Sequence, residues 1–173
     1  MKLLNWVRFS WDLSVITPTQ VDLPSHYAIT PATNEDEKEV RKVLSCSFLL
    51  DPAWNPAIGE VMHRLQGWLD RAFLAEEDTC LALRHGSRII GASVLCLDPD
   101  AESHFTPGPC ILMEYRNRGF GNNLLQASLQ MLRESGVKRA SGLARESSPV
   151  AKFLYPKYGG VAEPAKITIP LAA

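Results

Sequence analysis

The sequence predicts a mixed α/β fold, because segments with the two-residue alternation of strands are interleaved with segments of helical periodicity. With 173 residues, 46% of them hydrophobic, the chain is long enough to bury a core of its own. The strong alternation near the N-terminus is separated from the rest by a proline-punctuated link. We therefore expect an N-terminal extension with an extra strand, residues 1–25, and a single domain, residues 26–173.

The first half of the chain predicts two strands followed by two helices. Residues 8–15 alternate strictly between polar and apolar side chains, which indicates a half-buried strand. The sequence leaves open whether this strand extends the sheet or pairs with another subunit. After the link 17–25, a short strand is expected at 26–30. A first helix starts near Asn34, capped by Thr33 or Asn34, and a second runs from the loop 51–56 to about Leu74. Their apolar faces comprise Val40, Val43, Leu44 and Ser47, and then Ile58, Val61, Met62, Leu65, Leu69 and Phe73.

The second half returns to strands. Residues 80–83 and 89–97 flank a tight turn at 85–87 and predict a hairpin. A polar loop, 98–103, precedes a strand that ends at Met113 or Glu114. A helix with Leu125, Leu129 and Leu132 on one face ends at Gly136. A strand at 139–144, a short helix from Ser148 to about Tyr158 and a last strand at 166–171 complete the expected order.

Composition excludes several classes of protein. The net charge of −1 and the pI near 6.4 lack the basic field that nucleic-acid-binding proteins usually carry. Polar and charged residues interrupt any leader-like run in 1–9, and no stretch approaches the roughly 20 apolar residues of a membrane span. We expect a soluble, cytoplasmic protein with no nucleic-acid and no membrane partner.

The four cysteines are Cys46, Cys80, Cys96 and Cys110, and none forms a CxxC pair. This spacing argues against a zinc site and against a dense disulfide framework. We expect free thiols that pack as small core residues, and no bound metal.

The run Tyr115-Arg116-Asn117-Arg118-Gly119-Phe120-Gly121 predicts a phosphate-binding turn. It lies between an expected strand and an expected helix, and the N-terminus of a helix presents unpaired N–H groups to anions. Glycines allow close approach of the backbone, while Arg116 and Arg118 suit phosphate oxygens. The alternative is a solvated turn with arginines on the surface. Neither the P-loop pattern nor GxGxxG is present, so the expected ligand is a pyrophosphate held without a required metal.

Two motifs resemble the GNAT superfamily of acyl-CoA-dependent N-acyltransferases. The stretch 111–121 is similar to the family's strand and V-x-P-x-Y-R-x-x-G-x-G motif, and 148–160 is similar to N-x-x-A-x-x-x-Y-x-K-x-G-F. The resemblance covers residues 26–171. It implies a mixed, mostly antiparallel central sheet of six to seven strands flanked by about four helices. The chain departs from the pattern at Met113, at Ser148, which keeps a capping side chain, and at Pro156, which interrupts the helix beside Tyr155.

The resemblance also implies an activity, in which an acetyl group passes directly from acetyl-CoA, the co-substrate, to a primary amine of a small molecule or peptide. Tyr155 would be the acid that protonates the leaving sulfur, with Tyr158 as the alternative if Pro156 shifts the register. Backbone amides of 111–113 would polarise the thioester carbonyl. The residues expected to bind CoA are Ile111, Leu112, Met113, Arg116, Asn117, Arg118, Gly119, Phe120, Gly121, Asn122 and Ser148.

The base and the acceptor are less defined by the sequence. Glu114, Glu102, His104 and Glu146 are candidate bases, although each is also an ordinary surface residue, and a water relay would need none of them. Trp54, Trp68, His63 and Arg64 are candidates for the acceptor pocket. A non-catalytic acyl-CoA-binding module, a general interaction domain and a homodimer remain open alternatives.

Overall fold

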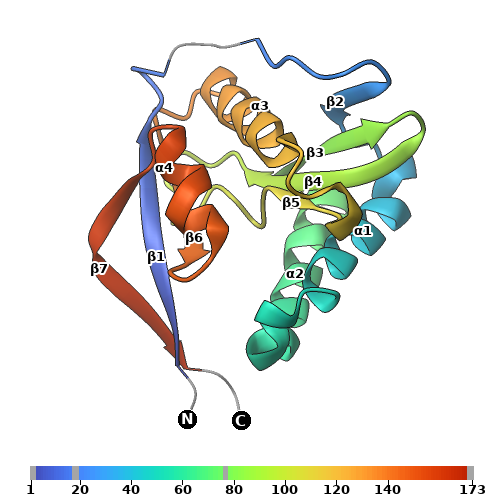
Figure 1. Cartoon of the computed structure of the whole chain (residues 1–173). Helices are drawn as coiled ribbons and strands as arrows, with labels where there is room; N and C mark the ends of the chain where they lie inside the picture. The colour runs from blue at the N-terminus through green and yellow to red at the C-terminus, as the bar shows by residue number, and fades with distance from the viewer. Residues whose placement is uncertain (1–2, 17–19, 76–77, 171–173) are drawn as a thin grey trace.

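The computed structural model describes residues 3–16, 20–75 and 78–170. This part of the chain contains seven strands and four α-helices, arranged as two antiparallel sheets with helices packed against them (Figure 1). The expected mixed α/β architecture is confirmed, although two sheets replace the single central sheet. The strands are β1 Leu3–Asp12, β2 Tyr27–Pro31, β3 Asp78–His85, β4 Arg88–Cys96, β5 Cys110–Ile111, β6 Arg139–Arg145 and β7 Val161–Pro170; the helices are α1 Glu37–Leu49, α2 Ile58–Phe73, α3 Phe120–Glu134 and α4 Tyr155–Lys157.

The first sheet has the order β2-β3-β4-β5 and is covered on both faces. Helix α3 lies on one face, and α1 and α2 lie together on the other (Figure 1). The apolar stripes that predicted α1 and α2 are the faces that pack inward. Val40, Leu44, Leu65 and Leu69 are all fully buried. The helical periodicity of the sequence therefore reports burial against this sheet.

The second sheet has the order β6-β1-β7, so the N-terminal extension supplies its middle strand. Its pairing to β6 and β7 lies within one chain, which answers the question that the sequence left open. Strand β1 begins at Leu3, earlier than expected, and its Trp11 is fully buried. Strand β7 begins at Val161 rather than 166. Strand β7 contains Pro164 and is an edge strand of this sheet, a position where proline is tolerated.

The two sheets are joined at His104 and Ser141. The His104 N–H donates to the Ser141 carbonyl at 2.7 Å, and the Ser141 N–H donates to His104 Nδ1 at 2.9 Å. Beyond this point β5 stays with the first sheet and β6 with the second. We call the place where they part, between β5 and β6, the β5–β6 junction.

The chain between Ser148 and Tyr158 forms an irregular helix. A π-helical turn, Val150–Leu154, precedes the short α4, which has Pro156 in its first turn. Proline cannot donate to a preceding carbonyl, so a regular helix is interrupted where the sequence predicted a kink or an early end. Among the described residues, none of the helices combines the length and the apolar character that a membrane-spanning helix requires.

Candidate functional site

The glycine turn forms the N-terminus of α3. Gly119 has a left-handed backbone, with φ of 83°, and Asn117 has φ of 61°. Asn123 makes the first helical hydrogen bond, to the Gly119 carbonyl at 3.3 Å, so the amides of Phe120 and Gly121 have no intrahelical acceptor. A Cβ at Gly119 would come no closer than 4.0 Å to another side chain. The turn therefore presents free N–H groups in an open, positively polarised position.

The guanidinium of Arg116, which was expected to bind a phosphate, is bonded within the protein instead. Its Nε donates to the Ile111 carbonyl at 3.0 Å, its Nη2 to the Ser47 carbonyl at 3.0 Å, and its Nη1 pairs with Asp51 Oδ2 at 2.8 Å. Three bonds within the protein use the planar fork of the side chain. Arg116 thus ties β5 to the end of α1, and its side chain is not free to bind a phosphate.

Arg118 is the exposed arginine of the turn. Its Cζ lies 5.4 Å from the centre of the Tyr115 ring, a cation–π distance. The Tyr115 hydroxyl shares a hydrogen bond of 2.9 Å with His85 Nδ1, and the His85 ring stacks on Tyr27 at 4.4 Å. Phe120 is buried against Tyr27. The rings of Tyr27, Tyr115 and Phe120 thus pack together under the turn, on its buried side. Arg118 lies at the surface beside the helix N-terminus.

The amides of residues 111–113 divide between two directions. The Leu112 N–H donates to the Ile90 carbonyl at 2.9 Å, so it belongs to the sheet and cannot polarise a ligand. The Ile111 carbonyl faces away from β4, toward Arg116, and the N–H of the same residue points to that side too. Met113 is 44% exposed. Of the three residues proposed from the sequence, Ile111 has the amide that faces the β5–β6 junction.

Tyr155 lies in the core, with 1% of its surface exposed. Its ring packs edge-on against Trp11 at 4.8 Å and against Phe9 at 5.3 Å. Its hydroxyl donates to the Gly108 carbonyl at 3.0 Å. Burial raises the pKa of the Tyr155 phenol well above its ordinary value, because the phenolate would lose its hydration. The side chain thus reaches from α4 across to the segment that leads into β5, and it is protonated.

Ser148 and Tyr158 flank Tyr155 along the chain. Ser148 Oγ accepts from the Ala151 N–H at 3.2 Å and donates to the Arg145 carbonyl at 2.7 Å. Ser148 therefore caps the irregular helix, as its side chain predicted. Tyr158, the alternative acid, is half-buried beside Lys157.

The candidate bases are scattered. Glu114 pairs with Arg88 at 2.9 Å at the surface, and Glu102 is exposed. Glu146 contacts Asn5 at 3.4 Å. His104 is buried at the joint between the sheets, where burial lowers its pKa. None of them lies beside Tyr155 in a hydrogen bond, so the structure does not single out a base among the described residues.

The loop that carries Trp54 bridges the two sheets. The Trp54 ring packs on Phe48 of α1 at 5.2 Å and on Trp6 of β1 at 5.8 Å, and Arg145 of β6 covers it at 5.0 Å. Trp54 could be proposed from the sequence but Trp6 and Arg145 could not, since only the pairing of β1 with β6 brings them to this loop.

The other residues proposed for the acceptor pocket lie along α2. His63 and Arg64 are exposed, and Arg64 pairs with Glu60 one turn earlier at 2.8 Å. Trp68 is half-buried against the hydrophobic core. Trp54 therefore lies beside β6, next to the β5–β6 junction. The three residues of α2 lie at the helix surface or against the core and make no contact with this junction in the described interactions.

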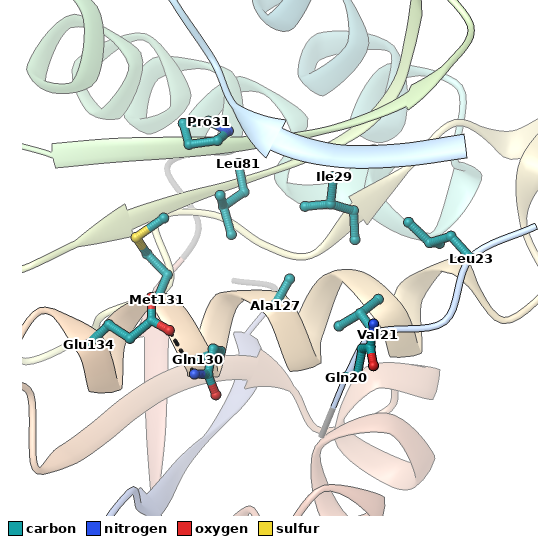
Figure 2. Close-up of a pocket in the computed structure, with 10 residues that line it drawn as sticks. All are labelled: Gln20, Val21, Leu23, Ile29, Pro31, Leu81, Ala127, Gln130, Met131 and Glu134. Carbon is teal, nitrogen blue, oxygen red and sulfur yellow. Dashed lines mark hydrogen bonds between the residues drawn. The ribbon is translucent and has the colours of Figure 1, made fainter. Parts of the chain in front are cut away.

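A hollow of about 470 Å³ lies elsewhere, between the segment 20–23, β2, β3 and the C-terminal half of α3 (Figure 2). Its walls are mainly apolar, with Ile29, Leu81 and Met131 among them. Helix α3 separates it from the glycine turn, which stands at the opposite end of the helix. This hollow has no part in the site built above.

All four cysteines are free, as expected. Burial raises the pKa of the Cys110 thiol to about 12, so it is protonated. Among the described residues, no group of three His, Cys, Asp or Glu side chains is placed to hold a metal ion.

Comparison with known proteins identifies a family for most of the chain. Residues 39–159 match the family model described as "Acetyltransferase (GNAT) family". No curated protein matches the sequence. Several solved structures share the fold at low sequence identity, and low identity of this kind bears on the fold alone.

Three of these structures illustrate the likeness. A GCN5-related N-acetyltransferase from Sphaerobacter thermophilus has a TM-score of 0.66 at 15% identity, over 94% of this chain and 50% of its own. One from Ralstonia eutropha has a TM-score of 0.60 at 14% identity, over 85% and 99%. A GNAT family acetyltransferase from Brucella melitensis, solved in complex with acetyl-CoA, has a TM-score of 0.51 at 18% identity, over 66% and 73%. The chain spans about half of the Sphaerobacter protein, and 48% of a similar Drosophila protein.

Proposed function

The chain belongs to the GNAT acetyltransferase family, and from this premise we propose that it transfers an acetyl group from acetyl-CoA to a primary amine of a small molecule or peptide. The observation that carries the proposal is the N-terminus of α3 with its left-handed Gly119. The acetyl-CoA bound to the Brucella relative supports the choice of donor.

The turn fits the pyrophosphate of CoA. The amides of Phe120 and Gly121 are unpaired within the helix, and Gly119 and Gly121 leave space in front of them. Arg118 stands exposed beside these amides and adds a positive charge. The thioester supplies the activated acyl group. The residues of the chain bind it and stabilise the negative charge that develops on its oxygen and its sulfur.

Charge develops at two places during direct transfer, and one residue is proposed for each. The Ile111 N–H faces the β5–β6 junction and stabilises the negative charge on the thioester oxygen. The neutral amine forms the acyl C–N bond as the C–S bond breaks. The nitrogen then loses one proton to water, and the departing sulfur gains one. Tyr155 is protonated and already donates across this junction to Gly108. As the acid, it exchanges that bond for one to the sulfur.

The second candidate function is a non-catalytic acyl-CoA-binding module. The burial of Tyr155 and its bond to Gly108 favour it, because both observations also describe a tyrosine that only holds α4 against β5. The two candidates make the same prediction for CoA binding and opposite predictions for turnover.

Two measurements in sequence test the proposal. Calorimetric titration with acetyl-CoA comes first, and no binding at millimolar ligand would overturn both candidates. Release of free CoA thiol with a panel of primary amines then separates them. Amine-dependent thiol release supports the enzyme, whereas tight binding without turnover of any amine supports the binding module.

A further inference from the structure

The outer face of the β6-β1-β7 sheet carries aromatic and basic side chains. Side chains alternate along β1, so Phe9 and Trp11 point toward Tyr155 and α4, while Trp6 and Arg8 point to the opposite face. This outer face is the one that meets the loop containing Trp54.

Among the residues that the structure describes, Arg8 has no partner for its charge. Its Nε is buried without a hydrogen bond, and in residues 3–16, 20–75 and 78–170 it makes no ion pair. The neighbouring positions on the same face of β1 are Trp6 and Ser10, which carry no charge. A guanidinium whose donor is shielded from water and left unpaired is costly unless a ligand satisfies it.

Arg145 lies diagonally across from Arg8. It is opposite Trp6 in the β1–β6 register, and Arg8 is opposite Leu143. Diagonal neighbours of this kind are about 7–8 Å apart. Arg145 donates to the Ala53 carbonyl and covers the Trp54 ring, and no carboxylate in the described residues pairs with it. Two neighbouring guanidiniums, neither of them bonded to a carboxylate of the described residues, can bind an anion together.

The two arginines lie close to the proposed site of transfer. Strand β6 borders the β5–β6 junction, and β1 is the next strand, about 4.8 Å further on. The glycine turn approaches this junction from the side of α3 and α4, where Gly121 neighbours Leu154. Arg8 and Arg145 lie on the other side of the sheet, from which an acceptor can approach without meeting the CoA.

We infer that the acceptor is a small amine that carries a carboxylate, bound by Arg8 and Arg145. The inference rests on the proposed function and names its substrate class. The planar forks of the two arginines suit a carboxylate, and the half-buried Trp6, opposite Arg145 on the same face, offers apolar surface for the methylene groups between carboxylate and amine. Because Arg8 is only one strand from the junction, the amine and the carboxylate are a few bonds apart.

Matched amines test the inference. Thiol release from acetyl-CoA is measured with glycine, β-alanine and γ-aminobutyrate, each against the alkylamine that remains when its carboxylate is removed: methylamine, ethylamine and propylamine. We expect kcat/KM to be at least about tenfold higher for the amino acid in the preferred pair, the effect of one charged hydrogen-bonded contact. Phosphoethanolamine is a further probe, and a preference for it over every amino acid would overturn the choice of a carboxylate.

Variants then assign the effect to the arginines. Arg8→Gln should raise the KM for the preferred amino acid about tenfold or more and bring the ratio within the pair toward one. Arg139→Gln is the matched control: Arg139 lies on the same face of β6, next to Asp12, whose pKa it helps to lower. This control should keep the wild-type ratio.

The outcomes separate the inference from the proposed function. Transfer to alkylamines as fast as to amino acids, or an unchanged ratio in Arg8→Gln, overturns the carboxylate-bearing acceptor and leaves the acetyltransferase standing. A folding defect in Arg8→Gln lowers transfer to both members of a pair and so does not imitate the expected change in ratio. Binding of acetyl-CoA without transfer to any amine overturns the proposed function, and the inference with it.

Discussion

The hydroxyl of Tyr155 donates to the carbonyl oxygen of Gly108, 3.0 Å away, across the place where the two sheets part. One bond thus links α4, which carries the tyrosine, to the segment leading into β5. The same hydroxyl would serve either as the acid of the reaction or as a structural hydrogen bond to Gly108.

Tyr155→Phe removes the hydroxyl and keeps the ring in its aromatic surroundings. We expect turnover to fall by about 10²–10⁴, the range for loss of a general acid, with acetyl-CoA affinity nearly unchanged. Steady-state thiol release and calorimetry measure the two quantities. Tyr158→Phe is the matched control and should stay active. A fully active Tyr155→Phe enzyme would show that the acid lies elsewhere and that the bond to Gly108 is structural.

Gly119→Leu should weaken acetyl-CoA binding. The substitution forces a side chain into a backbone with φ of 83°, and it places that side chain in front of the helix N-terminus. Gly136→Leu is the matched control, since Gly136 has φ of 90° in open space at the other end of α3. Both variants should lose about 1–2 kcal/mol of stability from the strained backbone. Only Gly119→Leu should raise the Kd measured by calorimetry, and equal Kd values in both variants would count against the turn as the CoA site.

Arg116→Lys tests whether the guanidinium of Arg116 stabilises the fold or binds a phosphate of CoA. Lysine keeps the positive charge but cannot donate to Ile111, Ser47 and Asp51 together. We expect a loss of about 1–3 kcal/mol in the free energy of unfolding by urea.

A double-mutant cycle of Arg116→Ala with Asp51→Ala should show that the two losses are not additive. If Arg116→Lys instead left stability intact and weakened only CoA binding, the assignment of Arg116 to the protein framework would be wrong.

His104 should make stability depend on pH. Its Nδ1 accepts from the Ser141 N–H and its Nε2 lies 3.0 Å from the Asp98 carbonyl, so the ring is held neutral, and burial lowers its pKa. A lowered pKa means that the unfolded state binds the proton more readily. The contribution is therefore fully present above the unfolded pKa of about 6.5 and is lost as pH falls below it, by up to about 1.4 kcal/mol per pH unit.

Urea unfolding of the wild type and of His104→Gln between pH 5 and 7.5 measures this dependence. Glutamine keeps one donor and one acceptor but does not titrate, so the variant should have a flatter profile over this range. Identical profiles would remove His104 as the source of the dependence.

The order of elements followed from local patterns. Alternation predicted β1, and helical spacing predicted α1, α2 and α3, because burying one face of an element imposes the period on its sequence. Gly136 ended α3 as expected, with a positive φ that other residues resist. The bounds of strand β5 were harder to predict: a strand ending at Met113 or Glu114 was expected, whereas β5 comprises Cys110–Ile111. Residues 104–107 pair separately with the end of β4, through bonds of Thr106 and Pro107 to Val94 at 2.8 Å.

The glycine turn could be predicted from the sequence, since a strand, Gly119, Gly121 and an amphipathic helix are contiguous and their geometry is local. The sequence also predicted the cap at Ser148 and the irregularity at Pro156. The tertiary structure alone decided where Arg116 points, how deeply Tyr155 is buried and that Arg8 and Arg145 are neighbours. These facts depend on contacts between residues 47 to 137 positions apart. The partner of a side chain across such distances is set by the packing of two sheets, which no local pattern records.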